Sequence, residues 1–550
     1  MNKTAIAPLL ATTLLVLTAC SSGGGNNEPP PPPPPPPPIT KAEAYQFLNQ
    51  ATFGATEDEA QVVIDAGFEA WIDDQLQKPA SLQLPFLQSV PPPMFPFQLQ
   101  PDRVDIWFRY ALSGEDQLRQ RVAFALSEIM VVSQLGVLDG QPFALASYYD
   151  MLAENAFGNY RDLIEDVTLH PAMGAYLSML GNEKPDPVNN IRPDENYARE
   201  LMQLFSIGLV ELNQDGSVQT NAQDEPIPTY DQAVIEGFAH VYTGWTYAGS
   251  PVFRGARPTA TNQVIPMQLW PTFHDTGAKT LLGGETIPPG QTGDQDLADA
   301  LDNVFAHSNV GPFMAIRLIQ RLVTSNPSPA YVSRIAAVFN DNGAGVRGDL
   351  GAVVKAILMD PEARPAIRVD SDGKIKEPIL RLTQFWRAYN AASESGRYPY
   401  NFAYIIFGQG PLQSPSVFNF FSPFYAPPGE IRDDDLVAPE LEIATEYLNT
   451  YMTNYMFLQT FFWNHTVDSS NPDITEDTVL IDFAEEVALA ADADALIDRV
   501  AEKLLAGDIS APLRTEINNM LALVPADQDL LRAAEAIYFV VTSPEFAYQR

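Results

Sequence analysis

The sequence predicts a mainly α-helical, all-α protein, with one large domain of many helices and long irregular loops. Apolar residues from residue 41 onward recur mostly at the three- and four-residue spacing of amphipathic helices, as Ala44, Phe47, Leu48 and Ala51 do. Clusters of glycine and proline separate these segments, and the chain has no repeat of fixed period. With 550 residues, 46% of them hydrophobic, the chain is long enough to bury a large core.

Residues 1–20 have the pattern of a lipoprotein signal peptide. Lys3 supplies positive charge, and residues 5–19 form an apolar stretch too short for a typical membrane span. The stretch ends in Leu-Thr-Ala-Cys at 17–20, which resembles the bacterial lipobox, in which the cysteine is lipidated. An ordinary signal peptide with a chance cysteine is the alternative. Because Cys20 is the only cysteine, disulfides, cysteine metal ligands and cysteine nucleophiles are excluded from the mature domain.

The next segment reads as a tether, residues 21–40. Its Gly/Ser-rich start is flexible, and the ten consecutive prolines at 29–38 form a stiff rod of roughly 30 Å. Ser21, directly after Cys20, is typical of lipoproteins sent to the outer membrane. We therefore expect a lipid-anchored protein of the bacterial cell envelope that contacts the membrane only through its anchor. The helical domain covers 41–550, with a candidate subdomain boundary in the polar stretch 466–477.

The charge balance excludes some partners. Formal net charge is -37, from 69 acidic and 32 basic residues. Nucleic acid binding requires a positive surface, so no nucleic acid partner is expected. The same balance argues against a basic patch on a membrane surface.

The most informative stretch is 190–208, within which we predict one helix. Pro193 suits its first turn, and Gly208 is a natural stop. At helical spacing one face carries only polar side chains, which makes it a candidate binding face: Asn196, Arg199, Glu200 and Gln203.

Two irregular segments also have a pattern typical of function. Residues 250–293 contain no helical pattern and have room for a minor β-hairpin, and loops this long are usually functional or disordered. The aromatic stretch 418–425 is a candidate surface for carbohydrate or protein, although aromatic side chains more often anchor a loop or fill a core.

Several blocks, in their order along residues 41–550, resemble the bacterial domain-of-unknown-function-1800 family. The central block is ENYARELM at 195–202. The others are TFGAT at 52–56, PAM at 171–173, TGW at 243–245, HD at 274–275 with Lys279, GQ at 408–409 and SPEF at 543–546. The chain departs from the family pattern at Gln203, where a glutamate is common, and at 416–421, where many relatives have Gly-Trp. The resemblance implies a helical, secreted or envelope-associated protein without an established activity, and a secreted sulfatase-like partner. It adds Trp245 to the binding candidates.

Five residues could form a catalytic or metal site. His240 follows Glu236 by four residues, so both project from one helix face, and His274 with Asp275 lies in the long irregular segment. Together with Glu200, such nitrogen and oxygen ligands suit zinc or another divalent cation, with one carboxylate as general base toward a bound water. The competing interpretation is structural. Arg199 and Glu200 would then form a buried ion pair, and His274 and Asp275 would fasten the long loop.

Two functions therefore stay open. One is a non-catalytic binding or assembly protein for a secreted partner or an envelope polymer, which we favour. The other is a metal-dependent hydrolase of extracellular polymers or esters. The sequence fixes neither an activity nor a cofactor.

Overall fold

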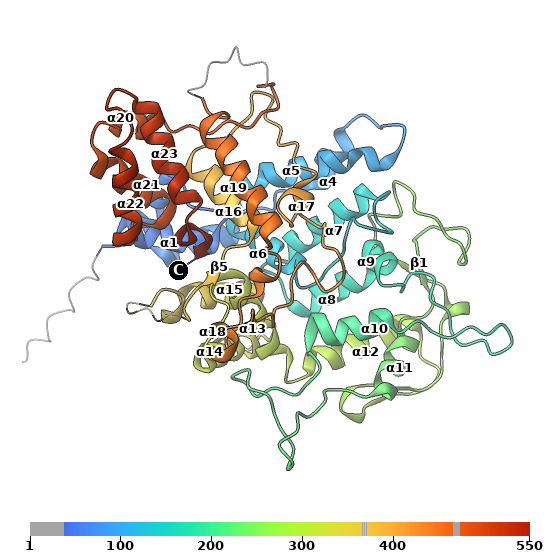
Figure 1. Cartoon of the computed structure of the whole chain (residues 1–550). Helices are drawn as coiled ribbons and strands as arrows, with labels where there is room; N and C mark the ends of the chain where they lie inside the picture. The colour runs from blue at the N-terminus through green and yellow to red at the C-terminus, as the bar shows by residue number, and fades with distance from the viewer. Residues whose placement is uncertain (1–37, 366, 368, 370, 466–473, 550) are drawn as a thin grey trace, which may run out of the picture. The chain divides into compact units, whose positions relative to one another are not determined.

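A computed structural model of the chain describes residues 38–365, 367, 369, 371–465 and 474–549 (Figure 1). The predicted signal peptide, its Cys20 and nearly all of the tether lie outside these residues. The predicted boundary at 466–477 lies mostly outside them too. No helix in the described part combines the length and apolar character that crossing a membrane requires.

The described residues contain 24 α-helices, which confirms the predicted fold class. The first nine are α1 (Lys41–Ala51), α2 (Glu57–Ala66), α3 (Phe68–Gln77), α4 (Gln83–Ser89), α5 (Gln100–Ser113), α6 (Gln117–Ser127), α7 (Pro142–Asn155), α8 (Tyr160–Leu169) and α9 (Pro171–Tyr176). The middle of the chain forms α10 (Asn196–Glu200), a π-helical segment η2 (Leu201–Ser206), α11 (Gln232–Val241), α12 (Gly293–Ala306), α13 (Val310–Leu322), α14 (Pro329–Asn340) and α15 (Leu350–Met359). The rest are α16 (Pro378–Ala388), α17 (Ala403–Ile406), α18 (Glu430–Asp433), α19 (Glu446–Phe461), α20 (Ala484–Leu489), α21 (Ala493–Leu505), α22 (Ala511–Leu521), α23 (Asp529–Val541) and α24 (Pro544–Ala547). Short 3-10 turns occur at Pro96–Leu99, Pro271–Phe273, Leu282–Gly284, Pro361–Ala363 and Pro439–Glu442.

Local sequence explains where several of these helices begin. The Thr40 hydroxyl accepts from the Glu43 amide while the Glu43 carboxylate accepts from the Thr40 amide, which satisfies two free groups at the start of α1. Thr292 and Gln295 repeat this arrangement at α12. The Asp349 carboxylate accepts from the Ala352 amide and starts α15 in the same way.

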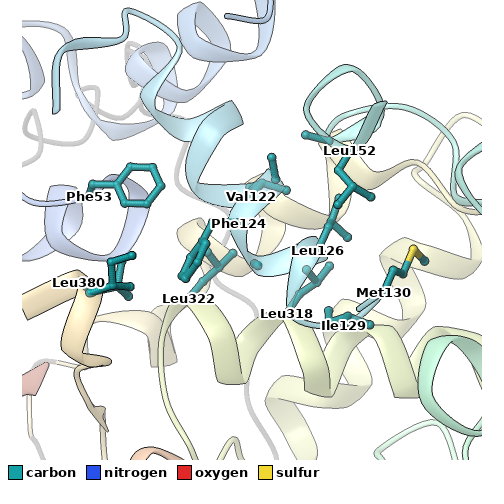
Figure 2. Close-up of a cluster of buried hydrophobic side chains, with 14 of the residues drawn as sticks. Phe53, Val122, Phe124, Leu126, Ile129, Met130, Leu152, Leu318, Leu322 and Leu380 are labelled. Carbon is teal, nitrogen blue, oxygen red and sulfur yellow. The ribbon is translucent and has the colours of Figure 1, made fainter. Parts of the chain in front are cut away.

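Helix α6 lies in the centre of the core. All of its residues except Arg119 are buried, and it packs against α1, α3, α5, α7 and α13. Figure 2 shows its Phe124 and Leu126 above Leu322 and Leu318 of α13. Because the last turn of α6 leads to Glu128 and Ile129, this packing also fixes where those two side chains point.

Three antiparallel pairs of two-residue strands accompany the helices in the described residues. Strand β3 (Lys279–Thr280) pairs with β4 (Thr286–Ile287), which is the minor hairpin predicted within 250–293. Strand β1 (Trp245–Thr246) pairs with β2 (Gln268–Leu269) and fastens the same irregular segment to the end of α11. Strand β5 (Lys374–Ile375) pairs with β6 (Tyr548–Gln549) and ties the end of the chain to the segment before α16.

The C-terminal helices α20–α23 pack together and return to the start of the domain (Figure 1). Helix α21 contacts both α1 and α16. Its Arg499 pairs with Glu57 of α2 at 2.5 Å, and Lys41 of α1 pairs with Glu502 at 2.8 Å. The residues after 473 therefore pack on the first helices of the same core.

Candidate functional site

The central stretch is helical over a shorter range than its sequence predicts. Helix α10 begins only at Asn196, so the prediction that Pro193 opens the helix is wrong. The Asp194 carboxylate accepts from the Asn196 amide and starts the helix there. After Glu200 the chain widens into the π-helical segment η2, in which the Ser206 hydroxyl donates to the Leu201 carbonyl at 2.6 Å. Gly208, at φ +74°, ends it as predicted.

The polar face splits at this π-helical segment. Asn196 is exposed and Glu200 is buried, whereas Gln203 lines a cavity described below. A π-turn adds a residue to the turn, which shifts Gln203 out of helical phase with the residues before it. Such segments are frequent at functional sites, so η2 indicates a candidate functional site at this end of the helix.

The expected ion pair between Arg199 and Glu200 does not form. Arg199 pairs instead with Glu195, one turn earlier, at 3.0 Å. The Glu200 side chain is buried, and its Oε2 has no hydrogen-bond partner among the described residues. Burial raises the pKa of Glu200, and the charge of Arg199 opposes this only in part.

Glu236 lies in a different polar cluster from Glu200. Gln232 donates to Glu236 at 3.3 Å and to Glu195 at 3.0 Å, which joins α11 to the start of α10. The structure records no hydrogen bond between Glu200 and either predicted histidine within the described ranges. Among the described residues, Glu200 is therefore not hydrogen-bonded to either of the predicted histidine ligands.

His240 and Asp275 do come together, as the sequence predicts. The His240 Nδ1 is in close contact with the Asp275 Oδ2, and this bond is the main reason that the pKa of Asp275 falls to about 2. Thr243 supports the pair, because its hydroxyl donates to the His240 carbonyl and accepts from the Asp275 amide. The contact holds the irregular segment against α11.

His274 points the other way, into the core. Its Nε2 lies 3.0 Å from Asp296 on α12, and its Nδ1 lies 2.9 Å from the Thr243 carbonyl. Lys279 lies 2.5 Å from the same Asp296 carboxylate and also donates to the Asp275 carbonyl. Both ring nitrogens of His274 are thus engaged inside the protein.

The predicted metal site is therefore only partly assembled. In the parts of the chain that the structure describes, no group of three or more His, Cys, Asp or Glu side chains is placed to hold a metal ion. His240 and Asp275 provide two ligands of the kind zinc takes, while a protein zinc site normally uses at least three.

Trp245 occupies strand β1 and is buried. Its ring lines a surface cavity of about 490 Å³ together with Leu169, Met267 and Leu269. The indole nitrogen has no hydrogen-bond partner among the described residues. Trp245 thus faces a different cavity from Gln203.

A second cavity, of about 590 Å³, collects four segments that are distant in sequence. We call it the Phe cavity. It is bounded by residues 128–129 after α6, by η2 with the arm 207–218 that follows it, by α13 and by the aromatic segment 417–424. Its apolar lining residues are Ile129, Leu204, Ile207, Leu209, Val210, Leu212, Val218, Phe313, Ile316, Val417, Phe418, Phe421, Pro423 and Phe424.

The mouth of the Phe cavity is apolar as well. Leu209, Val218, Phe418 and Phe424 all line it and are exposed, with Phe424 showing 70% of its surface. Asn309, just before α13, fixes the arm by donating to the carbonyls of 207 and 210 and accepting from the amide of 212. The aromatic stretch 418–425 thus divides: Phe421 is buried, while Phe418 and Phe424 are not.

Two charged lining residues of the Phe cavity, Glu128 and Arg321, belong to a buried cluster with Glu377, which we call the floor of the cavity. Arg321 lies 3.3 Å from Glu128 and 3.9 Å from Glu377, and both carboxylates are buried. Gln409 donates to both, at 3.0 Å to Glu128 and 2.5 Å to Glu377. Burial raises the pKa of Glu128, and the neighbouring charge of Glu377 raises it further.

The pKa of Glu377 shifts in the opposite direction, because more cations surround this carboxylate. Burial alone would raise its pKa, but Lys374, Arg321 and Arg121 outweigh this and lower it. Lys374 also pairs with the buried Glu440, at 3.1 Å. The charged form of Glu377 is thus favoured, whereas the neighbouring Glu128 is more easily protonated.

The backbone adopts uncommon geometry at one residue of the Phe cavity. Asn419 has φ +66°, a value that residues other than glycine rarely adopt. Asn419 lines the cavity and donates to Glu128 at 3.4 Å. Strain of this kind costs on the order of 1–3 kcal/mol per residue and clusters at functional sites.

Sequence reasoning found part of the Phe cavity. It singled out Gln203 and the aromatic stretch, and it missed Glu128, Arg317 and Arg321. No local motif contains these three, and only the packing of α6 against α13 brings them together.

Fold and site together define an all-α protein with a large apolar cavity over a floor of buried charges. The chain belongs to the family described as "Protein of unknown function (DUF1800)", which it matches over residues 46–548. This confirms the resemblance drawn from the sequence blocks. No curated protein and no solved structure matches the chain.

Proposed function

We propose that this protein is a non-catalytic binding protein of the bacterial envelope, and that the Phe cavity is its binding site. The observation that carries the proposal is the cavity itself. Its volume of about 590 Å³ and its mainly apolar lining, with a few polar groups, are typical of sites for small ligands or apolar groups of larger ones.

The exposed mouth supports the same function. Leu209, Val218, Phe418 and Phe424 all belong to the cavity lining, and each of them is exposed to solvent. Large apolar side chains exposed around one cavity are typical of a binding site. A membrane-anchored protein with such a cavity could bind the apolar group of a molecule in the envelope.

The envelope location is part of the proposal. It rests on the lipobox-like sequence at 17–20 with its single cysteine, Cys20, and on the proline tether that follows. The secreted sulfatase-like partner implied by the family resemblance is also proposed, as a protein that acts beside this one. The alternative function, a metal-dependent hydrolase, rests on the contact between His240 and Asp275.

A fluorescence titration with N-phenyl-1-naphthylamine, a neutral apolar probe, tests the binding function. The wild-type protein should bind it, and Val218→Trp should weaken binding by about tenfold, or 1.4 kcal/mol. Val218 is half exposed at the mouth, so the larger ring can block the entrance without entering the core.

The matched control is Val188→Trp, the same exchange at a side chain that is 93% exposed and outside the cavity lining. It should bind the probe as the wild type does. If the wild type does not bind the probe, or if both variants bind it equally well, the Phe cavity is not the binding site.

A further inference from the structure

Arg317 is the one guanidinium in the lining of the Phe cavity, among the described residues, that has no carboxylate partner within 4.0 Å. Its head lies over the ring of Phe424 at 4.6 Å and over that of Phe313 at 5.2 Å. Its Nη1 donates to Gln320 at 2.8 Å. Burial lowers the pKa of Arg317 to about 9, so the side chain still carries its charge at neutral pH.

Arg321, one turn further along α13, provides the comparison. It also lies over an aromatic ring, that of Phe421, at 4.7 Å. Unlike Arg317 it has Glu128 and Glu377 as counter-charges. An anion placed at Arg321 would therefore meet these two carboxylates, whereas no carboxylate of the described residues lies within 4.0 Å of the Arg317 guanidinium.

The composition of the chain sharpens this contrast. It contains 69 acidic residues against 32 basic ones, yet none of the described carboxylates lies beside Arg317. Burying a cation without a counter-charge costs free energy, and a bound anion would offset that cost. The lining also offers Gln203, Asn419 and Ser422 as neutral hydrogen-bonding groups.

Building on the proposed function, we propose that the ligand is a single-chain amphiphile with a compact anionic head. Its carboxylate or phosphate monoester pairs with Arg317, and its aliphatic chain fills the cavity between η2 and the aromatic segment. The chain is recognised by the apolar wall, which includes Leu204, Ile207 and Ile316. Arg317 sets the preference for an anion, because charge-assisted bonds to a guanidinium are the stronger ones.

Isothermal titration calorimetry with three ligands of equal chain length tests this proposal. They are dodecanoate, dodecyl phosphate and dodecan-1-ol. The wild-type protein should bind at least one of the two anions about ten times more tightly than the alcohol, since one charged hydrogen bond is worth roughly 1.5 kcal/mol or more. Which anion binds more tightly identifies the head group.

Arg317→Gln should abolish this preference, measured within the variant as the ratio of its affinity for each anion to its affinity for dodecan-1-ol. The matched control is Arg257→Gln, which removes a charge at an exposed position outside the cavity and should keep the preference. A preference that persists in Arg317→Gln would overturn the assignment to Arg317.

The wild-type comparison does not depend on how any variant folds. If all three ligands bind the wild type with equal affinity, the anionic head is refuted while the proposed cavity binding stands. If dodecan-1-ol and the neutral naphthylamine probe both fail to bind, the proposed function itself fails.

Discussion

Replacing Arg321 with methionine should destabilise the protein mainly through the carboxylates it leaves behind. Methionine keeps the apolar stem that packs in α13 but removes the charge 3.3 Å from Glu128 and 3.9 Å from Glu377. At an effective dielectric constant of about 20, each contact is worth roughly 4–5 kcal/mol of Coulomb attraction when both carboxylates are ionised. Losing the cost of burying Arg321 offsets part of this, so we expect a net loss of about 3–5 kcal/mol in the free energy of unfolding.

The loss should depend on pH. The folded-state pKa of Glu128 is already raised, and without Arg321 it should rise further. A group with a raised folded pKa contributes stability at low pH that is lost as pH rises through that pKa. The deficit of the variant relative to the wild type should therefore be large at about pH 8 and smaller at about pH 6, where Glu128 is protonated.

Urea unfolding followed by far-UV circular dichroism measures both quantities. The double variant Glu128→Gln with Arg321→Met should recover about 2 kcal/mol or more relative to Arg321→Met alone, because it removes one uncompensated charge. A cost below about 1 kcal/mol at both pH values would refute the reasoning. So would a deficit that does not change with pH.

Three further predictions concern other parts of the chain. Glu200→Gln should stabilise the protein by roughly 1–2 kcal/mol at about pH 8 in thermal unfolding, because it removes a charge from a buried carboxylate whose Oε2 has no hydrogen-bond partner among the described residues. Since burial raises the pKa of Glu200, the gain should vanish below about pH 4.5, where the carboxyl group is protonated in both the folded and the unfolded state. A gain at low pH would contradict this. Elemental analysis of protein purified without a histidine tag should find well under one zinc per chain, whereas one zinc lost on His240→Ala would favour the hydrolase. Cys20→Ser should move the protein from the membrane fraction to the soluble fraction, and a variant still held at the membrane would refute the lipid anchor.

Local sequence rules predict the fold class well, but they predict the structure of the central stretch 190–208 less well. Helical spacing and capping residues such as Thr40 and Asp349 work through near neighbours in the chain, so sequence alone locates many helices. The stretch 190–208 departs from this because its predicted polar and apolar faces depend on a constant helical period. The π-helical segment after Glu200 breaks that period, and its cause lies in packing and in the bond from Ser206 to Leu201.

The Phe cavity could be predicted only in part, for a related reason. Its aromatic segment stands out in the sequence, but whether a phenylalanine is buried like Phe421 or exposed like Phe424 depends on what packs beside it. Arg317 and Arg321 lie one turn apart on the same helix, and each lies over a phenylalanine ring. Only the fold shows that Arg321 has a counter-charge. Predicting that difference requires knowing that α6 places Glu128 beside α13.

A crystal structure with 12-bromododecan-1-ol tests the central claim most directly. The ligand is neutral, so the result does not depend on the role of Arg317, and its bromine can be located by anomalous scattering. The proposed function predicts bromine density inside the Phe cavity, between Leu204 of η2 and Phe421 of the aromatic segment. Bromine bound only elsewhere, for example in the cavity beside Trp245, would contradict it.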